Sequence, residues 1–117
     1  MRKLLFVGLT LFVSSLTVSA EINEPSNHAG QCFALFEFSR QVTEDPQAKS
    51  IFEEARKRAG ASLIRLKTSE GYSFDTTSEN AFNNQMKELL MHYSQMNRTL
   101  TLDELNQLWD QCEVEFL

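Results

Sequence analysis

Apolar residues recur at spacings of three and four along most of the chain, and this period predicts four α-helices. We expect them to run from about 28 to 42, from 46 to about 70, from about 77 to 97 and from about 102 to 116. No stretch alternates polar and apolar residues for long enough to favour a β-strand. The pattern therefore predicts an all-α fold.

Capping residues precede each predicted helix, because their side-chain oxygens can accept a hydrogen bond from a free backbone N–H group. The expected N-caps are Ser26 or Asn27, Asp45, Thr76 or Thr77, and Thr101. Pro46 suits the first helical position after Asp45. Glu79 and Glu104 each stand three residues after a threonine, which is the spacing of a capping box.

Each of the two cysteines lies within an apolar helical stripe. Cys32 lies between Ala29 and Phe36 in the first predicted helix, and Cys112 lies between Leu108 and Phe116 in the last. Both stripes should face the core, so we expect one disulfide that joins the first and last helices. The alternative is a pair of buried free thiols. The fold predicted in this way is a small four-helix bundle, either orthogonal or up-and-down.

The first 20 residues have the features of a cleaved signal peptide. Arg2 and Lys3 precede an apolar run over residues 4–13, and small residues occupy 18 and 20 before Glu21. The alternative is an uncleaved N-terminal anchor. Cleavage would leave residues 21–117 as a single helical domain, located in the periplasm or secreted, with no further segment apolar enough to span a membrane.

The charge of the chain limits its partners. Without residues 1–20, 9 basic and 16 acidic residues remain, which gives a net charge of −7. Nucleic acid and anionic lipid should on average repel such a chain.

The sequence contains no pattern typical of catalysis or of cofactor binding. It has no G-x-S-x-G elbow, glycine-rich phosphate loop, calcium loop or C-x-x-C pair. His28 and His92 do not show metal-ligand spacing with the cysteines. We therefore expect no enzymatic activity, cofactor or metal.

Charge is distributed unevenly along the chain. Residues 46–70 carry six basic and three acidic residues, whereas residues 100–117 carry five acidic residues and no basic one. Pairs at i,i+4, Glu53 with Lys57 and Glu54 with Arg58, should neutralise part of the basic excess. The remaining basic residues and one apolar residue that points away from the core form a candidate partner-binding set: Lys49, Arg56, Lys67 and Phe38. The alternative is that these are ordinary solvated faces.

These features favour an exported, non-enzymatic helical protein that binds another protein in the cell envelope or outside the cell, as an inhibitor, immunity factor or adaptor does. A periplasmic stress chaperone is the alternative, because protonation of many carboxylates in acid would loosen a small bundle.

Overall fold

Four α-helices make up the part of the chain that the computed structural model describes, residues 24–117. The helices are α2 (Pro25–Val42), α3 (Pro46–Ser69), α4 (Glu79–Arg98) and α5 (Leu102–Phe116). No strand occurs between residues 24 and 117. The predicted all-α fold with four helices is confirmed; the predicted signal peptide, residues 1–20, lies outside the described residues.

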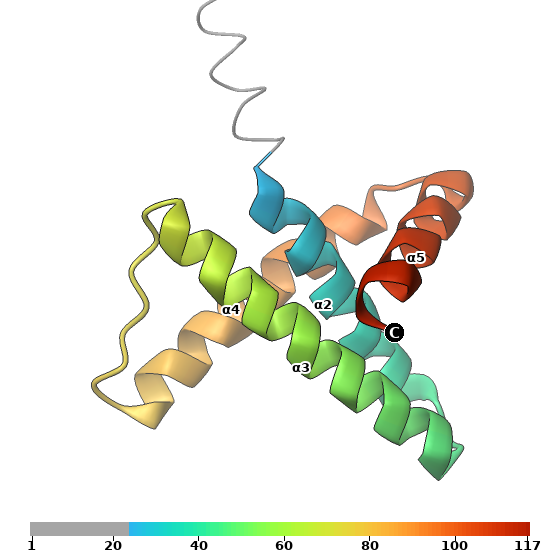
Figure 1. The fold of residues 1–117 in the computed structure, drawn as a ribbon, viewed down its shortest axis with the longest axis horizontal. Helices are drawn as coiled ribbons and strands as arrows, with labels where there is room; N and C mark the ends of the chain where they lie inside the picture. Colours follow the sequence, from blue (N-terminus) through green and yellow to red (C-terminus); the bar gives the residue numbers. More distant parts are fainter. Residues whose placement is uncertain (1–23) are drawn as a thin grey trace, which may run out of the picture.

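The central element is α2, which contacts each of the other three helices. In Figure 1, α3 lies in front, α4 lies behind, and α5 lies to the right of α2. The paths of α3 and α4 cross in this view, so the arrangement matches the orthogonal alternative rather than four up-and-down rods. Helix α5 also contacts α3, so α2, α3 and α5 each contact the other two.

Local capping signals correctly located two of the four helix starts. The Asp45 carboxylate accepts a hydrogen bond from the backbone N–H of Ala48 at 2.9 Å, directly before Pro46. Thr101 and Glu104 form the expected capping box, with distances of 3.2 and 2.8 Å. These helix starts depend only on neighbouring residues, which is why the sequence predicts them well.

The other two starts differ from the prediction. Helix α4 is capped by Ser78, whose hydroxyl accepts from the N–H of Ala81 at 3.0 Å, because Thr77 is instead hydrogen-bonded to Asp75. Helix α2 begins at Pro25, earlier than expected, and its N-cap residue Glu24 makes no side-chain capping bond. Ser26 therefore lies inside the helix, where it has a different role.

The core is one hydrophobic cluster to which all four helices contribute. Its buried apolar members are Ala29, Cys32, Phe33, Ala34, Phe36, Ala55, Ala59, Leu63, Leu89, Tyr93, Leu108, Cys112 and Phe116. The predicted Cys32–Cys112 disulfide is present, closes a sequence separation of 80 residues and is fully buried. It holds α5 against α2 at the centre of the core.

Candidate partner-binding surface

Of the four predicted partner-binding residues, three lie on α3 and Phe38 lies on α2. Lys49 is exposed near the start of α3, whereas Lys67, near its end, places its ammonium group 5.3 Å from the centre of the Tyr72 ring. Phe38 is exposed on α2. Arg56 lies beside the Glu37 carboxylate of α2, so its charge is partly matched within the chain.

Arg56 belongs to a half-buried charge cluster centred on Glu37. The Glu37 carboxylate, 12% exposed, lies 3.2 Å from Nε of Arg56 and accepts hydrogen bonds from Arg40 and Gln41. Burial alone raises the pKa of Glu37, but the hydrogen bonds from Arg40 and Gln41 and the charges of Arg40 and Arg56 outweigh it and hold this pKa below its ordinary value. The cluster joins α2 to α3 through an ionised carboxylate.

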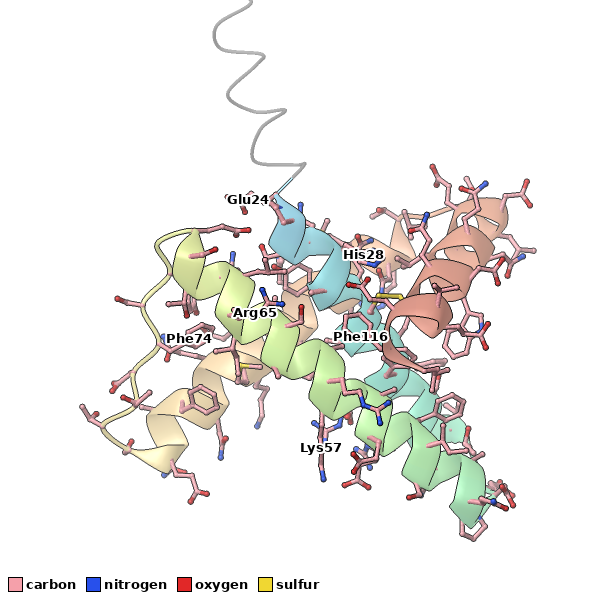
Figure 2. All side chains as sticks on the ribbon, in the orientation of Figure 1. Glu24, His28, Lys57, Arg65, Phe74 and Phe116 are labelled. Atoms are coloured by element: carbon pink, nitrogen blue, oxygen red, sulfur yellow. A yellow bond between two sulfur atoms is a disulfide. The ribbon has the colours of Figure 1, made fainter. Side chains whose placement is uncertain are left out.

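Arg58 makes a contact that the sequence did not indicate. Its guanidinium donates a hydrogen bond to the carbonyl oxygen of Phe116 at 2.9 Å, while Lys57 approaches Glu54 at 3.6 Å. The expected i,i+4 pairs do not appear among the ion pairs of residues 24–117. The last turn of α5 has no basic residue of its own, so Arg58 provides the positive charge that a helix C-terminus favours. Figure 2 shows Phe116 at the end of α5 directed toward α2 and α3.

Glu70 caps the start of α2 from outside that helix. Its carboxylate accepts hydrogen bonds from the backbone N–H and the hydroxyl of Ser26, at 3.1 and 2.7 Å. Burial raises the pKa of Tyr93 and outweighs a hydrogen bond with Ser26, which lowers it; the charge of Glu70 raises it further. A residue 44 positions away in the sequence thus caps α2 in place of a local side chain.

Asn97 belongs to an Asn97-Arg98-Thr99 sequence that matches a glycosylation sequon. Its side chain forms two hydrogen bonds with Gln31 of α2. The Gln31 amide donates to Oδ1 of Asn97, and Nδ2 of Asn97 donates to the Gln31 carbonyl, both at 3.1 Å. The side chain of Asn97 therefore links α4 to α2.

An apolar groove of about 300 Å³ lies where α2, α4 and α5 meet. Its lining consists of Ala34, Leu35, Phe38, Ser94, Asn97, Arg98 and Leu105. The Phe38 side chain is 62% exposed although it forms part of this wall. Leu35, Phe38 and Val42 follow a spacing of three and four along α2, so a second apolar stripe was present in the sequence as a signal for this groove.

A wider hollow of about 690 Å³ lies between α2 and α5, lined by His28, Asp110, Gln111, Val114 and Glu115. Nε2 of His28 lies 2.7 Å from Oε1 of Glu115 and 3.7 Å from the sulfur of Cys32. Figure 2 shows His28 on the upper part of α2, beside α5.

The other histidine, His92, is exposed, and its ring packs edge-on against Tyr93 with centroids 4.9 Å apart. Within residues 24–117, no three His, Cys, Asp or Glu side chains are grouped so that they could hold a metal ion. No helix in the same range has the length and apolar character that crossing a membrane requires.

Comparison with known proteins gives no match: no family model fits the chain, and no curated protein or solved structure is significantly similar to it. Inference about function therefore depends on the residues of this chain and their arrangement.

Proposed function

We propose that this chain is an exported, non-enzymatic protein that acts by binding another protein. The observation that carries the proposal is the groove between α2, α4 and α5, in which the Phe38 ring is largely exposed at the edge of a well-packed core. An exposed aromatic side chain beside an apolar depression is typical of contact sites, because its burial on binding removes a large apolar area from water.

The chemistry of the groove favours a protein partner with an apolar side chain as its anchor. Leu35, Phe38 and Leu105 provide apolar contact, while Ser94 and Arg98 provide polar groups at the rim. Met91 and Leu102 add exposed apolar surface on α4 and α5. An apolar anchor with a polar rim is the usual anatomy of a protein–protein contact.

The disulfide supports export. A buried Cys32–Cys112 bond persists in an oxidising compartment such as the periplasm or the extracellular space, whereas cytosolic reductants keep most thiols reduced. The partner should then be found in the same compartment.

Affinity capture with matched variants tests this function. The wild-type chain and its Phe38→Ser and Ile51→Ser variants are used to capture proteins from the envelope and culture medium of the source. Ile51 is a suitable control because it is an exposed apolar residue of α3 that does not line the groove. We expect a partner that Phe38→Ser loses and Ile51→Ser retains; capture that is equal for all three chains would contradict the proposal.

A stress chaperone remains the second candidate, and one observation favours it. Carboxylates join the helices at three places: Glu37 with Arg56, Glu70 with Ser26, and Glu115 with His28. Protonation in acid would weaken all three while the disulfide still holds α2 to α5. Light scattering by an aggregating client protein at about pH 3, with and without this chain, tests this candidate; absence of protection would exclude it.

A further inference from the structure

The outward side of α5 is exposed, and no other helix of residues 24–117 covers it. Four residues of α5 and its C-cap residue follow one another at alternating steps of four and three on this side, and all are exposed: Asp103, Gln107, Asp110, Val114 and Leu117. We call these five residues the α5 outer face. Val114, 90% exposed, is the most exposed of the large apolar side chains in the described residues. Steps of three and four are those by which one helix packs against another.

The charged side chains of α5 are all carboxylates. Its acidic residues are Asp103, Glu104, Asp110, Glu113 and Glu115, and it contains no lysine or arginine. Glu104 belongs to the capping box and Glu115 pairs with His28. Asp103, Asp110 and Glu113 have no ion-pair partner among residues 24–117. A cationic partner would therefore meet carboxylates that are not already neutralised.

The wide hollow between α2 and α5 borders this face. Asp110 and Val114 belong both to the α5 outer face and to the lining of the hollow, together with His28, Gln111 and Glu115. The hollow thus places an apolar contact and a free carboxylate one turn apart, beside space for the side chains of a docked segment.

We infer that the α5 outer face is a docking surface for one cationic amphipathic helix of another protein, a site beyond the Phe38 groove. Apolar residues of the incoming helix contact Val114 and Leu117, and its lysine or arginine residues contact Asp103 and Asp110. Recognition of a helix by residues at these spacings is a common mode of peptide binding, and complementary charge accelerates and selects the encounter. A second copy is disfavoured as the occupant because the whole chain carries a net charge of −5.

A designed peptide provides the probe. It has about 18 residues, with leucine at steps of three and four and lysine elsewhere, which is long enough to form a helix when bound. Fluorescence anisotropy of the labelled peptide measures its Kd for the purified, disulfide-bonded chain. A peptide of the same composition in an order without helical periodicity is the first control, and a version with glutamate in place of lysine is the second.

Variants of the chain locate the binding site. We expect Asp103→Asn with Asp110→Asn to weaken binding about tenfold, and Val114→Ser to weaken it severalfold. Glu44→Gln with Glu88→Gln is the matched control, because both residues are exposed on other parts of the molecule and the total charge changes equally. This control and Phe38→Ser should leave the Kd within about twofold.

Several results would overturn the inference: no binding of the periodic peptide, equal binding of the aperiodic peptide, or equal weakening by the Glu44/Glu88 control. A loss caused by Phe38→Ser alone would place the peptide in the other groove and would equally reject the α5 outer face. Sedimentation of the chain without peptide identifies a second copy as occupant if self-association is abolished by Asp103→Asn with Asp110→Asn. Binding by the wild-type chain with these variant effects would support the α5 outer face even if no partner were captured through Phe38.

Discussion

The ring of Tyr93 lies directly against the backbone of Gly30. A Cβ atom placed at Gly30 would be 2.3 Å from Cε2 of Tyr93, and the ring itself is fully buried. Helix α4 therefore approaches α2 at a distance that only glycine permits. The Tyr93 side chain also interacts with Ser26, one turn earlier on α2.

Gly30→Ala should consequently destabilise the fold. The added methyl group must displace a fully buried ring, at a cost of about 2 kcal/mol or more. Gly60→Ala is the matched control, because its Cβ would lie 3.2 Å from a Phe33 ring carbon and alanine favours a helix by about 1 kcal/mol. Urea denaturation should show a large decrease in the free energy of unfolding for Gly30→Ala and a small change in it for Gly60→Ala. Equal effects would mean that the Tyr93 contact is not the cause.

Replacement of the disulfide should weaken the attachment of α5 before it affects the other helices. A closed loop of 80 residues contributes up to about 4.5 kcal/mol in the chain-entropy model. Chemical denaturation of the Cys32→Ala, Cys112→Ala chain should show a free energy of unfolding that is lower by most of this amount. Amide hydrogen exchange should increase most within α5, which would then keep only its packing and polar contacts such as Arg58–Phe116 and His28–Glu115. An equal increase in exchange rate across all four helices would contradict the prediction that α5 is affected first.

Glu37 should contribute to stability in a pH-dependent manner. Its pKa in the folded chain lies below the ordinary value of 4.5, so the ionised carboxylate stabilises the fold above about pH 4.5, and the contribution is lost as the pH falls through the lowered pKa. Glu37→Gln should therefore be less stable than the wild type at pH 7, and the two should converge in acid. Urea denaturation between about pH 7 and pH 3 measures this convergence; a constant difference across the range would be inconsistent with it.

Arg56→Met tests the other side of the same cluster. Loss of this cation leaves the buried Glu37 with fewer charged partners, at a cost of about 1–3 kcal/mol. Lys49→Met, an exposed change on the same helix, should cost less than about 0.5 kcal/mol. Thermal denaturation followed by circular dichroism compares the two. If the two variants had the same melting temperature, Arg56 would be an ordinary surface residue, as the sequence had indicated.

Glu70→Ala should loosen the start of α2 specifically. The variant removes the carboxylate that accepts from the N–H and hydroxyl of Ser26, and loss of an N-terminal cap costs about 1 kcal/mol. Hydrogen exchange in the first turn of α2 should increase, while exchange in α5 should not change. Glu88→Ala, an exposed change on α4, is the control. Unchanged exchange at Ser26 would show that the cap contributes little.

The sequence by itself determined the helical fold, two helix starts and the cysteine pair. The stripe through Cys112 and the caps at Asp45 and Thr101 depend on residues close together in the chain, so the sequence alone predicts them. The disulfide was predictable because the chain has two cysteines, each on an apolar face. Local capping signals misplaced the start of α2, since its cap comes from Glu70, the residue directly after α3.

Only the tertiary structure decided which charges are structural and which surfaces remain open. Arg56 and Arg58 are two residues apart on α3, yet one lies beside Glu37 and the other is hydrogen-bonded to the end of α5. Phe38 lines a groove only because residues of α4 and α5 form the rest of its wall. These contacts join residues far apart in the sequence, and they depend on the angles at which the helices cross, which are set by close approaches such as that of Tyr93 to Gly30.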